Sequence, residues 1–244
     1  MSRVRVSSSA PVLPHRARPG PAPALPARFR RVIGVSEFAG FPVAALDFYD
    51  DLELDNTRSF WEAHKQVYLD AVRAPMEALC AALEPEFGAA KIFRPYRDVR
   101  FRKDKTPYKT HQGAFVAVGA STGWYVQISP RGVSTEGGFY RATPEHLARI
   151  RSAIDETRTG TELEQIVAAL RSEGWEVGGD RLKTTPRGYD ADHPRIDLLR
   201  HRSLSAVHDI GFGPVVHTGE LLDVVRADWA RLRPLVEWVA RYTD

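Results

Sequence analysis

The 244-residue chain has a single cysteine, Cys80, so no disulfide can form within it. Cys80 lies in an apolar stretch with helical spacing, where a buried structural thiol is expected and not a nucleophile. A lone cysteine is typical of the reducing cytoplasm, and we expect that location. No apolar run approaches the roughly 20 residues that a membrane-spanning helix needs, and the N-terminus lacks the apolar core of a secretory signal.

The sequence also lacks the motifs of several common enzyme classes. We find no glycine-rich phosphate-binding loop, no dinucleotide-binding fingerprint and no Gly-x-Ser-x-Gly elbow between a strand and a helix, because Gly-Ala-Ser-Thr-Gly at residues 119–123 is expected to be the turn of a hairpin. These absences argue against the usual nucleotide and serine hydrolases. His and Asp occur together at residues 190–193 and 208–209, but without a known metal-ligand spacing. We therefore expect no metal and no cofactor, and residues 192–194 are interpreted as a turn.

The basic character of the chain belongs to its N-terminal end. Residues 1–34 carry seven arginines and no acid, so the rest of the chain has a net charge of −4 and gives little support for a nucleic-acid partner. Residues 1–35 are rich in Pro and Arg and are predicted to be a disordered extension. Val35 is a candidate for the natural start of the protein, because a GTG start codon is conceptually translated as Val.

The pattern of apolar residues predicts helices packed on a sheet. Helices are expected at residues 43–52, 58–83, 144–156, 162–171 and 220–241. Strands are expected at residues 91–93, 98–101, 114–118, 124–129, 132–140, 175–177 and 204–210. Pro75 and Pro234 should split or kink the long N-terminal and C-terminal helices. A mostly antiparallel meander flanked by helices is an α+β fold, which we expect to be one domain over residues 36–244.

Residues 94–111 form a dense basic cluster. They carry a net charge of +5, whereas the rest of the chain from residue 35 onward carries −9, and this asymmetry focuses the electric field on an anion. Three of the six lysines in the chain, Lys103, Lys105 and Lys109, lie within seven positions here. A lysine presents a compact point charge, which suits a single phosphate oxygen or a proton transfer.

The expected geometry of this cluster is a strand followed by a loop. A strand would turn Val99 and Phe101 toward the core, and Asp98 and Arg100 away from it. Residues 103–107 would then form a loop at the strand end, a common location for binding groups.

The main hypothesis is a pocket for a small anionic ligand that bears a phosphate or a carboxylate. The expected ligand-binding residues are Arg94, Arg97, Asp98, Arg100, Lys103, Asp104, Lys105, Tyr108 and Lys109. If the site is catalytic, Lys105 or Tyr108 is the candidate proton donor. Lys183, Arg187 and Tyr189 form a second polar loop that could close over the first.

Two alternatives stay open. The same basic face could serve a protein–protein or nucleic-acid interaction module. The charged residues could also form a purely structural network of ion pairs, although exposed pairs contribute only about 0–1 kcal/mol each. Side chains that converge on a concave site would favour the ligand pocket, and a flat basic face would favour a macromolecular partner. The sequence gives no oligomeric state and no reaction.

The cluster also carries a family resemblance. Arg94-x-x-Arg97-Asp98-x-Arg100-Phe101, followed by Asp104-Lys105-x-x-Tyr108, is similar to the signature of DUF2461, a bacterial family of unknown function. The segments 55–61, 137–151 and 182–194 also resemble this family, so that the similarity extends over about residues 36–243. The resemblance implies the importance of the cluster, and it implies no activity, substrate or cofactor.

Overall fold

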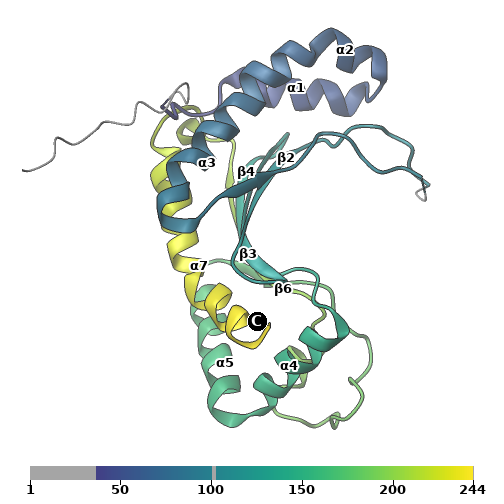
Figure 1. Ribbon diagram of the computed structural model, residues 1–244, viewed down its shortest axis with the longest axis vertical. Helices are drawn as coiled ribbons and strands as arrows, with labels where there is room; N and C mark the ends of the chain where they lie inside the picture. Colours follow the sequence, from purple (N-terminus) through teal and green to yellow (C-terminus); the bar gives the residue numbers. More distant parts are fainter. Residues whose placement is uncertain (1–36, 101–102, 244) are drawn as a thin grey trace, which may run out of the picture. The chain divides into compact units, whose positions relative to one another are not determined.

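The computed structural model describes residues 37–100 and 103–243, so the predicted disorder of residues 1–35 and the predicted orientation of Phe101 lie outside the described residues. The described strands form one antiparallel sheet with the order β1-β2-β3-β4-β6-β5 (Figure 1). These strands are β1 (Ala90–Ile92), β2 (Gln112–Ala117), β3 (Thr122–Ser129), β4 (Gly132–Phe139), β5 (Glu176–Gly178) and β6 (Leu204–Gly211). The first four follow one another as a meander, and the predicted α+β class is confirmed.

Helices precede the meander and follow it. The α-helices of the described residues are α1 (Val43–Leu54), α2 (Arg58–Val67), α3 (Ala74–Phe87), α4 (Pro144–Asp155), α5 (Thr157–Ser172), α6 (Ile196–Leu199) and α7 (Leu221–Thr243). A π-helical segment (Tyr68–Arg73) joins α2 to α3, and a short 3₁₀ helix (Pro214–His217) precedes α7. None of the helices in the described ranges is both long and apolar enough to cross a bilayer.

The helix expected at residues 58–83 is divided into α2 and α3 just before Pro75, as the sequence predicts. The chain nevertheless stays helical between them. Pro75 lies in the first turn of α3, where its missing backbone N–H is tolerated. Just before it, the N–H of Ala74 donates to the carbonyl of Leu69, which is the five-residue spacing of a π turn. The wider turn lets the chain stay helical from α2 into α3.

One face of the sheet holds the core, with α7 and α3 packed along it (Figure 1). Trp124 on β3 stacks on Trp229 of α7 with ring centroids 6.3 Å apart, and Phe87 meets both rings edge-on. The indole nitrogens are satisfied, since Trp124 donates to the carbonyl of Trp229 at 3.0 Å and Trp229 donates to that of Tyr125 at 3.2 Å. Large aromatic rings of this kind dominate the apolar area that a core buries.

The opposite face of the sheet centre is not covered by any described helix (Figure 1). Successive residues of a strand point to opposite faces, so Phe115, Tyr125 and Glu136 alternate with the core residues and lie on this open face. All three are only partly buried. The fold therefore presents a central sheet surface that carries aromatic and acidic side chains.

Several boundaries differ from the prediction for local reasons. α5 begins at Thr157, five residues earlier than predicted, because the carboxylate of Glu156 caps it by accepting from the N–H groups of Arg158 and Thr159. α7 continues as a helix through Pro234. Cys80 is buried in α3, as expected.

Replacing Trp229 with Ala should destabilise the protein by about 3–5 kcal/mol, because a fully buried indole and its contacts with Trp124 and Phe87 are lost. Equilibrium unfolding in urea measures this change. Trp229→Phe retains a ring and should cost clearly less than Trp229→Ala. Equal losses in the two variants would contradict a packing role for this side chain.

Candidate functional site

The basic cluster forms a long excursion between β1 and β2. Its two arms are held together near their base, where the N–H of Arg97 donates to the carbonyl of Pro107 and the N–H of Lys109 donates to that of Pro95, each at 2.8 Å. An isolated bridge between Tyr96 and Tyr108 lies between these bonds. We name residues 94–111 the basic loop.

The prediction of a strand at residues 98–101 is wrong for residues 98–100, which are irregular, and Phe101 is outside the described residues. Short acidic side chains bind the local backbone instead of leaving it to a strand partner. Asp98 accepts from the N–H of Arg100 at 3.3 Å, and Asp104 accepts from the N–H of Thr106 at 2.9 Å. Such local bonds compete with the hydrogen bonding of a sheet.

Four of the predicted ligand-binding residues pair with each other. Arg97 donates to Asp104 at 2.7 Å, and the guanidinium of Arg100 makes a two-point contact with Asp98 at 3.0 and 2.7 Å. Hydrogen bonds from Thr106, and then Arg97, hold the pKa of Asp104 below its ordinary value. These contacts join residues of the basic loop to one another.

Lys105 and Tyr108, the candidate proton donors, line neither of the two cavities described below. The Lys105 ammonium donates to the carbonyl of Val99 at 2.9 Å, within the loop. Tyr108 is buried, and its ring stacks on Trp61 with centroids 4.4 Å apart. Its backbone makes two hydrogen bonds of 3.1 Å with the side-chain amide of Asn56. Tyr108 thus anchors the loop to α2 and to the residue before its cap.

Among the described residues, two cavities adjoin the basic loop, and Lys109 and His111 line both. The smaller one has a volume of about 310 Å³ and is also lined by Arg97, Asp98 and Thr110. The larger one has a volume of about 480 Å³, within the range of about 300–1,000 Å³ that is typical of small-molecule sites. It lies on the open face of the sheet, and we name it the sheet pocket.

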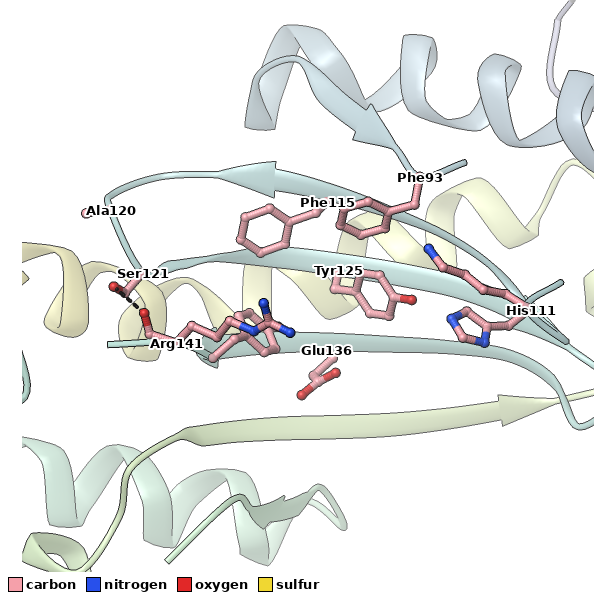
Figure 2. A pocket seen from close by; sticks show the side chains of 10 residues that line it. Phe93, His111, Phe115, Ala120, Ser121, Tyr125, Glu136 and Arg141 are labelled. Atoms are coloured by element: carbon pink, nitrogen blue, oxygen red, sulfur yellow. Dashed lines mark hydrogen bonds between the residues drawn. The ribbon is translucent and has the colours of Figure 1, made fainter. Parts of the chain in front are cut away.

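Figure 2 shows the sheet pocket from close by. The aromatic side chains Phe93, Phe115 and Tyr125 follow one another along it, with His111 toward one end and Ser121 and Arg141 toward the other. The residues that line the sheet pocket are Phe93, Lys109, His111, Phe115, Ala120, Ser121, Tyr125, Glu136, Tyr140 and Arg141. Four of the ten are Phe or Tyr. Five others are polar: Lys109, His111 and Arg141 are basic, Glu136 is acidic, and Ser121 carries a hydroxyl.

Glycines in the sheet make room for two of these rings. A Cβ atom added at Gly113 would lie 2.0 Å from the Tyr125 hydroxyl oxygen, and one at Gly123 would lie 2.0 Å from the carbonyl oxygen of Val116 and 2.7 Å from the tip of the Phe115 ring. Real Cβ atoms do not approach that closely, so both rings occupy space that any other residue would fill. The Tyr125 hydroxyl donates to Gln127 at 3.1 Å.

The basic end of the sheet pocket has perturbed side chains. Burial, and then Arg94, lowers the pKa of Lys109, whose ammonium lies 5.2 Å from the centre of the Phe93 ring. Burial, then Lys109 and Arg97, lowers the pKa of His111. Both shifts have the sign expected for positive groups that are crowded together and withdrawn from water.

Glu136 lies deeper in the sheet, across from Tyr125 on β3 and Val207 on β6. Burial raises its pKa, and a hydrogen bond from Ser205 opposes the shift in part. Burial also raises the pKa of Tyr125 and Tyr140, and the nearby charge of Glu136 adds to both shifts. Strongly perturbed groups that share one pocket are typical of functional sites.

Ser121 is the central residue of Gly-Ala-Ser-Thr-Gly at residues 119–123. The letters match those of the serine-hydrolase elbow, but here the segment joins strand β2 to strand β3, and not a strand to a helix. The Ser121 hydroxyl donates to the carbonyl of Arg141 at 3.0 Å and lies 3.2 Å from Nδ1 of His146. These contacts tie the turn to the start of α4.

The second polar loop stays apart from both cavities. Lys183 and Arg187 are exposed, and neither they nor Tyr189 lines either one. Tyr189 packs partly against the core and meets the ring of His193, which pairs with Asp155 at 3.0 Å. Within the described ranges, no group of three or more His, Cys, Asp or Glu side chains is arranged to hold a metal.

Of the predicted ligand-binding residues, Lys109 lines the sheet pocket, and most of the other residues that line it were not singled out from the sequence. Phe115, Tyr125 and Glu136 are directly paired across three strands, although about ten residues separate each from the next in the sequence. The available signal was the alternation of these residues with apolar ones in strands that are rich in glycine.

Asn56→Ala should destabilise the protein by about 1–3 kcal/mol, because the N–H and carbonyl of the buried Tyr108 lose their partner. Amide hydrogen exchange should accelerate in peptides from residues 94–111. Asp55→Ala removes an exposed neighbouring side chain and should leave that exchange unchanged. Slow exchange in the Asn56 variant would show that the amide does not anchor the loop.

The comparisons with known proteins agree with the resemblance noted in the sequence. No curated protein gives a significant match to the chain. Residues 44–238, most of the chain, match the family described as "Conserved hypothetical protein (DUF2461)". The protein therefore belongs to the DUF2461 family.

Proposed function

We propose that the protein binds a small anionic ligand, bearing a phosphate or a carboxylate, with its anionic group at Lys109 and His111. The observation that carries this proposal is that these two residues line both the sheet pocket and the adjoining cavity that contains Arg97. Positive groups of the basic loop therefore border a concave space, as a ligand site requires.

The charge of Lys109 supports this assignment. No acid lies within ion-pair distance of it among the described residues, whereas Arg97 and Arg100 each pair with an acid. Its lowered pKa reflects a positive charge that is poorly solvated and close to Arg94. A bound anion would relieve both effects, and a charge-assisted bond in such a place is stronger than one in open water.

The proposal uses fewer residues than the sequence predicts. Arg97 lines the smaller cavity although it also binds Asp104, so it is kept as a second contact. Lys105 and Tyr108 face neither cavity, and no reaction is proposed for them.

A second candidate is a polyanionic macromolecule on the outside of the basic loop. It is favoured by Tyr96, whose side chain is 47% exposed next to the exposed Arg94. Exposed aromatics among basic residues can stack on nucleic-acid bases. This candidate depends on outward-facing lysines such as Lys103, whereas the pocket depends on Lys109.

Lys109→Gln should weaken binding of a phosphate- or carboxylate-bearing probe such as phenyl phosphate by about tenfold or more, because a hydrogen bond to a charged group contributes about 1.5–3 kcal/mol. Isothermal titration calorimetry measures the affinity. Lys91→Gln removes one exposed positive charge from β1 and is the matched control, with no change expected. Loss of affinity in Lys103→Gln, with Lys109→Gln unaffected, would reject the pocket in favour of the outer face.

Anion affinity should also fall as the pH rises, first through the lowered pKa of His111, below the ordinary value of about 6.5, and then through that of Lys109, below about 10.4. The pKa of both His111 and Lys109 is lowered, so each loses its proton earlier than usual, and a bound anion favours the protonated forms. Binding should therefore take up protons, which calorimetry in buffers of different ionisation enthalpy detects.

Lys109→Arg tests the source of this pH dependence. A guanidinium keeps its proton throughout the range, so the decline of affinity in the alkaline half should become shallower. An identical pH profile in the two proteins would mean that Lys109 does not contact the anion.

A further inference from the structure

Glu136 is a carboxylate on the open face of the sheet that the anion proposal does not use. It lines the sheet pocket, and Figure 2 shows it below Tyr125, between His111 and Arg141. Its place in the sheet is fixed because β4 is paired on both sides, with β3 and with β6. The carboxylate thus projects from a rigid part of the fold.

The charge of Glu136 is not compensated by the described part of the protein. It takes part in no ion pair there, although the partly buried Glu162 and the exposed Glu173 pair with arginines of α7. The hydroxyl of Ser205 is its hydrogen-bond partner. Arg141 lines the same pocket, but no ion pair joins it to Glu136 among the described residues. A carboxylate held away from water without a cation is costly, so this site is electrostatically incomplete.

The surroundings of Glu136 favour a positive group as the missing partner. Tyr125, Tyr140 and Phe115 line the same pocket, and Phe115 meets Tyr140 edge-on with centroids 5.6 Å apart. The faces of aromatic rings carry negative electrostatic potential and attract ammonium groups. An aromatic wall with one carboxylate is therefore complementary to an amine, and it opposes a second anion.

We propose that Glu136 and the aromatic rings beside it bind an ammonium group, so that the ligand of the sheet pocket is a small zwitterion with its anionic group at Lys109 and His111. The anionic half rests on the function proposed above. The ammonium half rests on Glu136 and the rings beside it and does not require the anion site. Each half of the proposal can therefore be rejected without the other. The raised pKa of Glu136 agrees with this reading, because a bound cation would restore the ionised carboxylate.

Three probes separate the two halves. Benzoate carries only the anion, benzylamine carries only the ammonium group, and 4-(aminomethyl)benzoate carries both on one ring. Phenyl phosphate and 4-(aminomethyl)phenyl phosphate provide the same comparison for a phosphate. Calorimetry on the full chain should give an affinity for each zwitterion about tenfold above that for its amine-free partner, and measurable binding of benzylamine.

Glu136→Gln preserves the shape of the side chain and removes its charge. It should abolish benzylamine binding and reduce the preference for the zwitterion to about onefold, while the affinity for benzoate stays the same or rises. Glu176→Gln, an exposed acid on the edge strand β5, is the matched control and should leave every probe unchanged. Lys109→Gln should lower the affinity for the anionic probes and leave benzylamine binding intact.

The possible outcomes distinguish the two proposals. Equal affinities of the wild-type protein for each zwitterion and its amine-free partner, or no binding of benzylamine, would overturn the ammonium site and leave the anion site standing. A preference for the zwitterion that survives Glu136→Gln would also overturn it. Benzylamine binding that depends on Glu136, in a protein that ignores benzoate and phenyl phosphate, would support the ammonium site and reject the anion site for these probes.

Discussion

The fit of Tyr125 over Gly113 is the constraint on which the sheet pocket depends. The ring occupies the position of the side chain that Gly113 lacks, and Phe115 makes the same use of Gly123. Both rings can therefore lean over the sheet backbone instead of standing away from it. In an ordinary half-covered sheet, β-branched side chains at these positions would fill the open face. Here the missing side chains leave a hollow lined by aromatic rings, at the centre of the sheet and within reach of the basic loop.

The charged residues near this hollow divide into two groups with different physical roles. Within the loop, Arg97 and Arg100 lie against Asp104 and Asp98 in largely exposed pairs, which contribute little stability each, and the Arg97–Asp104 pair joins the two described arms. At the pocket, Lys109, His111 and Glu136 lack such partners among the described residues, and burial disfavours the charged form of each. The charges of the first group pair with one another. The proposals assign the second group to a bound ligand.

The sequence predicts the fold better than it predicts the site, and the reason is the distance over which each signal acts. The strands of the meander follow from alternation within five to eight residues, and α4 and α7 follow from helical spacing. The expected strand is absent at residues 98–100, where Asp98 accepts from the N–H of Arg100, a local competition that the hydrophobic pattern does not report. The row of Phe115, Tyr125 and Glu136 depends on the register of two hairpins, and a shift of one residue would turn each side chain to the other face.

The same contrast explains why the proposed site extends beyond the basic loop. Residues 94–108 attract attention because Arg, Asp and Tyr recur there in a regular pattern, and these residues largely bind one another or anchor the loop, as Tyr108 does on Asn56. A side chain that is engaged inside the protein has less to offer a ligand. The groups best able to bind one are those that the fold buries in part and leaves without a partner, and at the sheet pocket these follow the motif, at Lys109 and His111, or lie a strand away, at Glu136.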